Sequence, residues 1–352
     1  MEFAADERYV KVLGRTLYRD DIRYLGYSCS SVEFTFTGTK AEAVLWTNSP
    51  QLEDNLKAWV AVFVEEEETP SKRFALENEM GTYLLYEGTQ SKATKLRIVK
   101  YSEAAFGKVG IHKLIIDSEL QPEPASHKSR RLEFIGDSIT CGYGNEGIWN
   151  VDTFNTTQEN TWEAYAVRSA RKLAADYQLV CWSGIGIISD WTDQDIPNRE
   201  ILMPDLYLDT DRSTDLVLGN VEPERWDNSR YQPDCIIVNL GTNDNSYTKG
   251  IPDRVEDFEK NYYEFIKLVR IQNPAATVLC TLGAMGQELC DAILRQVERL
   301  VEEGDQKLYY MSFDLQDVKD GIGSDWHPSK RTHEKMAGKL EARIREIMDW
   351  KV

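Results

Sequence analysis

The sequence predicts two domains of different fold class, an N-terminal β-sandwich and a C-terminal α/β domain. Residues 1–120 contain short apolar or alternating runs without helical periodicity, which is typical of a β-sandwich, and a jelly roll in particular. Over residues 129–352, strand-like runs alternate with helical ones, which is typical of a parallel sheet covered by helices. Between them, residues 121–128 carry two prolines and are expected to form a linker.

The strands of the first domain are indicated by two kinds of pattern. Residues 31–37 alternate between apolar and polar side chains and stop at Gly38, as expected of a strand with one buried face. Residues 58–64 are apolar throughout and predict a strand that is buried on both faces. Further strands are expected near 43–46, 72–76, 81–87, 94–100 and 111–117.

The strands and helices of the second domain alternate along the chain. Strands are expected near 132–136, 178–182, 234–240, 276–281 and 307–313. Helices are expected at 162–177, 253–272, 287–303 and 330–349, each with an apolar stripe. This order predicts a three-layer α/β/α domain with a five-stranded parallel sheet. Ligands of such sheets bind at the carboxyl ends of the strands.

The charge of the chain argues against two classes of partner. There are 41 Lys and Arg residues against 59 Asp and Glu residues, so the formal net charge is −18. Such a surface repels phosphate backbones and anionic lipids, so neither nucleic acid nor a membrane is expected as a partner. No run approaches the roughly 18 consecutive apolar residues of a membrane span. Formation of a homo-oligomer stays open, since no apolar stripe decides it.

The first residues and the cysteines suggest a compartment. Residues 1–8 lack the basic and apolar regions of an export signal, so a cytoplasmic protein is expected, with secretion as the alternative if a signal was removed. None of the six cysteines forms a C-x-x-C pair, which predicts reduced core residues and neither disulfides nor a zinc site. No H-x-x-x-H spacing exists either, so no metal is expected. No organic cofactor is expected.

A serine follows the first strand of the second domain at a glycine-rich turn. The apolar run 132–135 leads into Gly136, which allows a sharp turn, and Ser138 comes two residues later. Gly142 and Gly144 leave space around the hydroxyl. This arrangement is typical of a serine nucleophile presented at the carboxyl end of a strand. The alternative is an ordinary turn with a solvated serine.

A serine nucleophile needs a base, and the chain has four histidines. His327 lies in a loop just before the last helix, on the carboxyl side of the last strand, with Asp325 nearby. It is therefore placed to accept the proton of Ser138, and Asp325 could orient its ring. The other three lie in the β-domain, the linker and the last helix, at His112, His127 and His333. The alternative for His327 is a loop residue that caps backbone groups.

Acyl transfer also needs hydrogen-bond donors for the developing oxyanion. Two further strands of the sheet end in loops that could supply them. Gly184 follows the second strand and offers a backbone N–H without a side chain in the way. Asn243 follows the third strand and offers a side-chain amide. Each turn alone is common, but three such strand ends followed by Asp-x-His are more specific.

Four motifs of the second domain resemble, in order, the blocks of the SGNH (GDSL-like) hydrolases. They are Gly136-Asp137-Ser138-Ile139, Gly184, Gly241-x-Asn243-Asp244 and Asp325-x-His327-Pro328. The resemblance implies that Ser138 is the nucleophile and His327 the general base. It also implies an oxyanion hole formed by the N–H groups of Ser138 and Gly184 with the side chain of Asn243. Asp137 and Asp244 are expected to brace their loops.

One position departs from the common pattern of these hydrolases. Most carry aspartate three residues before the histidine, where this chain has Ser324, and Asp325 lies two residues before it. This shorter spacing is similar to carbohydrate esterase family two, some members of which work with a Ser–His dyad. Two hypotheses therefore stay open: either the carboxylate of Asp325 supports His327, or a backbone carbonyl does.

The N-terminal β-sandwich is also similar, in length and architecture, to that of carbohydrate esterase family two. Those enzymes remove O-acetyl groups from xylan and other plant polysaccharides. The resemblance implies a serine esterase that deacetylates an oligo- or polysaccharide through an acetyl-serine intermediate. One alternative is an SGNH esterase or lipase that acts on other small or lipid-like esters. The other is a non-catalytic carbohydrate-binding protein.

Aromatic side chains near the motifs are candidates for binding sugar rings, which stack on flat aromatic faces. The candidate substrate contacts are Tyr143, Trp149, Trp191 and Trp326. Ordinary core packing is the alternative for each of them.

Overall fold

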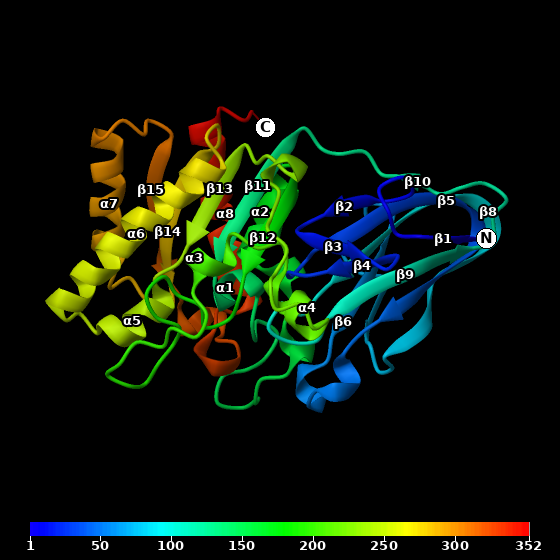
Figure 1. The fold of residues 1–352 in the computed structure, drawn as a ribbon, viewed down its shortest axis with the longest axis horizontal. Helices are drawn as coiled ribbons and strands as arrows, with labels where there is room; N and C mark the ends of the chain where they lie inside the picture. Colours follow the sequence, from blue (N-terminus) through cyan, green and yellow to red (C-terminus); the bar gives the residue numbers. More distant parts are fainter. Residues whose placement is uncertain (352) are drawn as a thin grey trace. The chain divides into compact units, whose positions relative to one another are not determined.

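The computed structural model describes residues 1–351 and separates the chain into two compact units. The first unit comprises residues 1–127 together with 155–157 and 210–224, and the second comprises the remaining described residues. Figure 1 shows the strands of the first unit in blue to cyan and the helices and strands of the second in green to red. None of the helices in residues 1–351 is long and apolar enough to cross a lipid bilayer.

The first unit is one antiparallel sheet of ten strands. Its main order is β3-β4-β9-β5-β8-β6-β7, with β1 paired to β9 and with β2 and β10 paired to β5. The strands are β1 (Glu2–Phe3), β2 (Lys11–Leu13), β3 (Thr16–Arg19), β4 (Ile22–Leu25), β5 (Ser31–Trp46), β6 (Trp59–Val64), β7 (Lys72–Ala75), β8 (Met80–Lys100), β9 (Val109–Ile116) and β10 (Glu123–Pro124). Two short 3-10 helices, Ser49–Gln51 and Asp54–Leu56, precede β6.

Two long strands, β5 and β8, run through both halves of this sheet. The pairs predicted as separate strands, 31–37 with 43–46 and 81–87 with 94–100, are each one continuous strand. The first half of β5 pairs with β2 and β10, whereas its second half pairs with β9. The register between β5 and β8 shifts near Gly38, where an irregular ladder lets the strands bend.

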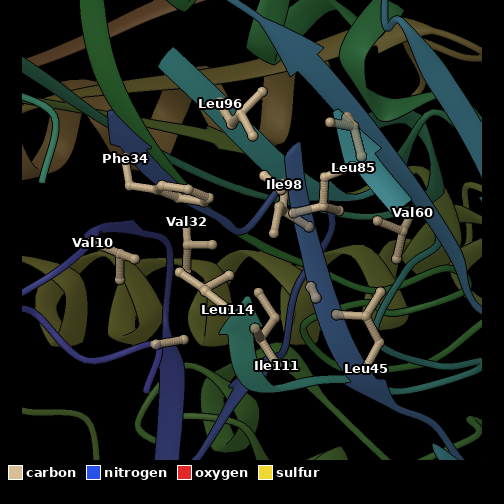
Figure 2. Close-up of a cluster of buried hydrophobic side chains, with 14 of the residues drawn as sticks. Val10, Val32, Phe34, Leu45, Val60, Leu85, Leu96, Ile98, Ile111 and Leu114 are labelled. Atoms are coloured by element: carbon tan, nitrogen blue, oxygen red, sulfur yellow. The ribbon is translucent and has the colours of Figure 1, made fainter. Parts of the chain in front are cut away.

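The two halves of the sheet enclose one hydrophobic core, as expected of a β-sandwich (Figure 2). Alternate residues of β5, such as Val32 and Leu45, are fully buried with Ile98 from β8 and Leu114 from β9. Residues between them, such as Thr35 and Glu42, are less buried, which is the period-two pattern that predicted the strands. The predicted fold class of this domain is confirmed.

The predicted linker contributes to the first unit, and so does part of residues 185–233, a long segment of the sequence with weak periodicity. In the linker, Pro124 pairs with Phe34 at the edge of β5. From the long segment, residues 210–224 include the helix α4 (Arg212–Val217), where the Ser213 hydroxyl donates to the Ala104 carbonyl at 2.7 Å. The sequence did not indicate this second contribution, because the segment lacks clear periodicity.

The second unit is a five-stranded parallel sheet with helices, as predicted. The strand order is β12-β11-β13-β14-β15, with β11 (Arg130–Gly136), β12 (Ala175–Cys181), β13 (Cys235–Asn239), β14 (Thr277–Ala284) and β15 (Leu308–Leu315). The helices are α1 (Ser138–Cys141), α2 (Tyr165–Lys172), α3 (Met203–Leu206), α5 (Thr242–Thr248), α6 (Pro252–Gln272), α7 (Cys290–Glu302) and α8 (Lys330–Met348). Helix α2 packs with α8, and α6 packs with α7 (Figure 1).

The strand order places β11, the first strand of this sheet along the chain, at the switch point of the sheet. The chain moves from β11 to β12 on one side and then to β13 on the other. Loops that leave neighbouring strands in opposite directions open a crevice at the carboxyl ends, which is where ligands of such sheets bind. Ser138 directly follows β11 and therefore lies at this point.

The bounds predicted for the helix at 162–177 are wrong at both ends, since α2 spans Tyr165–Lys172. Residues Thr161–Glu163 form a 3-10 turn that is capped by the Asn160 side chain, and α2 begins only at Tyr165. Ala174 takes a left-handed conformation, and every residue of β12 that follows is buried. The sequence predicted this strand only from residue 178 onward, and residues 175–177 were assigned to the helix instead. Within the sheet, the Gln178 side chain donates to Glu133 at 2.7 Å.

Candidate active site

The loops after the strands of the parallel sheet surround a cleft of about 750 Å³. Its lining residues are Ser138, Tyr143, Ser183, Gly184, Trp191, Thr242, Asn243, Asn245, Ser246, Met285, Asp325 and His327. All four predicted motifs contribute to it. Among these lining residues, only Asp325 and His327 carry side chains that commonly bind metals, and both have hydrogen-bond partners within the protein.

Ser138 is held at the start of α1 by the residue before it. Asp137 is the N-cap of this short helix, and its carboxylate accepts a hydrogen bond from the N–H of Ile139 at 3.0 Å. Burial raises the pKa of Asp137 to about 7, against the effect of this hydrogen bond. The Asp137 carboxyl group therefore braces the turn that leads into α1, as expected.

His327 lies beside Ser138, with its Nε2 atom 2.8 Å from the serine Oγ. Its other ring nitrogen, Nδ1, lies 3.2 Å from the carbonyl oxygen of Ser324 and 3.1 Å from that of Asp325. Because carbonyl oxygens only accept hydrogen bonds, Nδ1 must carry the ring proton. Nε2 is then unprotonated and can accept the proton of the serine hydroxyl.

The turn that supplies these two carbonyls is held by side chains and backbone of the second unit. The Ser324 N–H donates to the Gly144 carbonyl at 2.9 Å, and its hydroxyl donates to Gln158 at 2.7 Å. Asp325 and Trp326 both have positive φ angles, 50° and 65°, which L-residues rarely adopt. The surrounding contacts therefore fix an unusual backbone so that both carbonyls face the ring.

The carboxylate of Asp325 makes no hydrogen bond to the imidazole; it accepts one from the Tyr143 hydroxyl at 2.9 Å. Of the two hypotheses for Asp325, the geometry favours the one in which a backbone carbonyl orients His327. Tyr143 also stacks on Phe154, with ring centroids 3.7 Å apart, and lies 4.5 Å from the His327 ring. The Tyr143 contact ties the Asp325 side chain to the loop that follows Ser138.

A pair of substitutions at Asp325 distinguishes the two hypotheses. Asp325→Asn keeps the backbone carbonyl and an oxygen that can accept from Tyr143, so kcat/KM should fall by less than about tenfold. A carboxylate that orients the ring through Nδ1 would instead make this change cost about 10⁴-fold in kcat. Asp325→Ala removes the Tyr143 contact and should cost more than Asp325→Asn. Kinetics with an activated acetyl ester would measure both, and a 10⁴-fold loss in Asp325→Asn would refute the backbone hypothesis.

Burial lowers the pKa of His327 to about 4, although both carbonyls and the Asp325 charge act in the opposite direction. A general base works in its neutral form, so activity falls as the pH decreases through this pKa. The acidic midpoint of kcat/KM should therefore lie below pH 6.5, the usual pKa of histidine. A pH–rate profile at constant ionic strength measures the midpoint, and a midpoint at or above pH 6.5 would contradict the prediction.

Gly184 and Asn243 lie in the cleft with Ser138, as predicted. Among residues 1–351, no group accepts a hydrogen bond from the backbone N–H of Ser138 or of Gly184. The Asn243 amide donates one hydrogen to the Ile185 carbonyl at 2.9 Å, which leaves its second N–H free for another acceptor. These groups provide the donors that an oxyanion hole requires.

Gly184 occupies a position that only glycine fits well. Its φ angle is +86°, and a Cβ there would lie 2.5 Å from the Asp190 carboxylate. Its carbonyl accepts a hydrogen bond from the Trp191 N–H at 2.8 Å. The backbone at Gly184 is therefore fixed on the carbonyl side while its N–H stays available.

The four aromatic candidates separate into two pairs. Tyr143 and Trp191 line the cleft, and Trp191 is 60% exposed, so its face is available to a ligand. Trp149 and Trp326 are not among the lining residues, and their rings pack edge to face with centroids 4.4 Å apart. Both remain partly exposed. The sugar-binding role of all four stays a prediction.

Five residues of the cleft were not predicted from the sequence. Four of them adjoin predicted motifs and could have been included on that ground: Ser183, Thr242, Asn245 and Ser246. The fifth, Met285, directly follows β14. The sequence shows no polar motif at this position, so only the end of the strand indicates it.

Comparison with known protein families gives two matches that together cover most of the chain. A family model described as GDSL-like lipase/acylhydrolase matches residues 132–340. A second model, described as carbohydrate esterase 2 N-terminal, matches residues 12–124. The two matches fall on the parallel-sheet domain and on the β-sandwich, respectively.

Two relatives align with nearly the whole chain. The acetylxylan esterase / glucomannan deacetylase of Cellvibrio japonicus is 30% identical over 99% of this chain and 91% of its own length. The cellulase/esterase CelE of Acetivibrio thermocellus is 33% identical over 92% of this chain. The alignment spans only 38% of CelE, which is a much longer protein.

Solved structures of family two carbohydrate esterases align with nearly the whole chain. A family two carbohydrate esterase from Clostridium thermocellum, solved with cellohexaose, has a TM-score of 0.85 at 31% identity and covers 97% of this chain and 100% of its own. A family two carbohydrate esterase from Cellvibrio japonicus has a TM-score of 0.85 at 28% identity, with coverage of 99% and 98%. Since the hydrolase model spans more than half of the chain and the Cellvibrio relative aligns almost end to end, the chain belongs to the GDSL-like hydrolases and, within them, to the family-two carbohydrate esterases.

Proposed function

We propose that this protein is a serine esterase that removes O-acetyl groups from acetylated xylan or related plant-polysaccharide fragments. The observation that carries the proposal is the 2.8 Å contact between His327 Nε2 and Ser138 Oγ inside the cleft. The names of the relatives support the substrate class, because the Cellvibrio protein is an acetylxylan esterase / glucomannan deacetylase. The partner is therefore an acetylated oligo- or polysaccharide.

In the first half of the reaction, His327 Nε2 takes the proton of Ser138 as the serine Oγ attacks the acetyl carbon. The carbonyl oxygen becomes an oxyanion, which accepts hydrogen bonds from the N–H groups of Ser138 and Gly184 and from the Asn243 amide. The tetrahedral intermediate then collapses. The sugar oxygen leaves and takes the proton from Nε2, and an acetyl group remains on Ser138.

In the second half, water attacks the acetyl-serine and gives its proton to His327 Nε2. The same donors hold the second oxyanion. Collapse releases acetate and returns the proton to the serine Oγ. Throughout the cycle the imidazolium is stabilised at Nδ1 by the carbonyls of Ser324 and Asp325, which lie 3.2 Å and 3.1 Å away.

The test is acetate release from acetylated xylo-oligosaccharides, measured with the wild-type protein and with Ser138→Ala. We expect release by the wild type and none above background by the variant. Release that persists in the variant would overturn the serine mechanism. A wild type that cleaves only simple or long-chain acyl esters would support the esterase or lipase alternative, and sugar binding without any hydrolysis would support the non-catalytic alternative.

We also propose that the protein works in the cytoplasm. All six cysteines are buried and none forms a disulfide among the described residues, which suits a reducing compartment. Fractionation of the native organism, with antibodies against this protein, tests this. Detection in the culture medium would contradict it.

A further inference from the structure

Asp244 is a fully buried carboxylate whose partners are all backbone N–H groups of one loop. Its Oδ1 accepts hydrogen bonds from Ile187 at 2.9 Å, Ile188 at 2.7 Å and Ser189 at 3.2 Å. Its Oδ2 accepts a second bond from the Ile187 N–H at 3.1 Å. No cationic side chain within residues 1–351 pairs with it. The charge is thus balanced by the loop itself.

The loop that Asp244 holds begins with Gly184. Asn243, the residue before Asp244 in α5, donates to the Ile185 carbonyl at 2.9 Å. Asn243 and Asp244, neighbours in α5, therefore both hydrogen-bond the same loop. Asn243 donates to a carbonyl of the loop, and Asp244 accepts from its N–H groups. These hydrogen bonds fix the distance between the Gly184 N–H and the Asn243 amide.

Gly186 shows how tightly the loop encloses the carboxylate. A Cβ at this position would lie 2.8 Å from both carboxylate oxygens of Asp244 and 2.0 Å from the Ser189 carbonyl oxygen. Real Cβ atoms do not approach other atoms so closely. The loop therefore cannot wrap around Asp244 in this way unless residue 186 is glycine.

We propose that Asp244 is a positioning residue of the oxyanion hole. By binding three consecutive N–H groups, its carboxylate holds the loop so that the Gly184 N–H and the Asn243 amide point at one oxygen atom. Asp244 acts through Gly184 and does not contact the substrate. This inference rests on the acyl-transfer function proposed above.

The negative charge of Asp244 is part of this role. Burial raises the pKa of Asp244 to about 6, and the loop N–H groups oppose this shift, so the group is ionised at pH 8. An asparagine at this position keeps the shape but has only one acceptor oxygen. Its NH2 group would face the Ile187 N–H, and two donors that face each other cannot bond. Asp244→Asn is thus a small change that selectively loosens the loop.

The first experiment compares Asp244→Asn with the wild type at pH 8, with an activated acetyl ester. We expect kcat to fall about 10- to 100-fold, since small displacements of catalytic groups cost this much, while KM changes less than about threefold. Circular dichroism and thermal melting check that the variant is folded. An inactive wild type would refute the proposed function, whereas an active wild type and a folded variant with unchanged kcat would refute this inference alone.

A double-mutant cycle tests whether Asp244 acts through Gly184. If it does, Gly184→Ala should cost much less in the Asp244→Asn background than in the wild type, because the same donor has already been displaced. Fully additive losses in kcat would overturn the proposal.

The matched control is Asp176→Asn. Asp176 is also buried and accepts a backbone hydrogen bond, from Lys128 at 3.0 Å, but it lies at the amino end of β12, away from the cleft. We expect its kcat to stay at the wild-type value, and an equal loss in both variants would show a general packing effect. If Asp244→Asn does not fold, Gly186→Ala replaces it, since the added Cβ separates the loop from the intact carboxylate. A folded Gly186→Ala variant with wild-type kcat would overturn the inference.

Discussion

Replacing His327 by alanine should lower kcat by about 10⁴- to 10⁶-fold, which is the range for loss of the base in serine hydrolases. Its Nε2 atom lies 2.8 Å from Ser138 Oγ, and no other described histidine contacts that hydroxyl. Without the base, the serine must attack while still protonated, and the leaving sugar oxygen receives no proton. Steady-state kinetics with an activated acetyl ester measures the loss.

Two further variants make the His327 result interpretable. The Ser138→Ala change and the double variant should each be about as inactive as His327→Ala, because residues that act as one unit lose their effect together. His112→Gln is the control, since this histidine belongs to the β-sandwich unit, and it should keep wild-type kcat. A His327→Ala variant that retains more than about a tenth of the wild-type kcat would exclude a serine–histidine mechanism.

Replacing Gly184 by alanine should lower kcat by about 10²- to 10³-fold, the cost of losing one oxyanion donor. The added Cβ would lie 2.5 Å from Asp190, and the φ angle of +86° is unfavourable for alanine. The backbone must therefore turn, and its N–H no longer points at the oxyanion. KM should change little, because the donor acts mainly on charge that develops in the transition state.

Gly250→Ala provides the matched control for backbone strain. Gly250 has a similar φ angle of +71°, but no atom lies within 4 Å of the position of its Cβ. This variant should lose about 1 kcal/mol of stability while it keeps wild-type kcat. If both glycine variants show the same kcat, Gly184 does not supply a donor to the transition state.

The sequence predicted the fold class and the gathering of the four motifs because both depend on local patterns. Alternating strands and helices imply a parallel sheet, and residues that follow different strands of such a sheet meet at one edge. Ser138, Gly184, Asn243 and His327 each follow or approach such an end, so the topology alone brings them into one cleft.

Other features depend on tertiary contacts that leave no pattern in the sequence. The backbone carbonyl of Asp325 faces His327 because two consecutive residues adopt positive φ angles, and neither Asp325 nor Trp326 is a residue type that signals this by itself. The early end of α2 depends on Ala174, an alanine in a left-handed conformation that helix propensity does not favour as a stop. Met285 lines the cleft only because of the direction in which the chain leaves β14.

The two long strands of the β-sandwich have a consequence for how this domain unfolds. Because β5 and β8 pair with each other on both sides of the register shift near Gly38, the two halves of the sheet share both strands, and neither half can detach without breaking this pairing. If the hydrogen bonds of one half were lost, β5 and β8 would also lose their packing partners in the other half. The domain should therefore open as one cooperative unit, so that amides in both halves exchange with deuterium through the same global event.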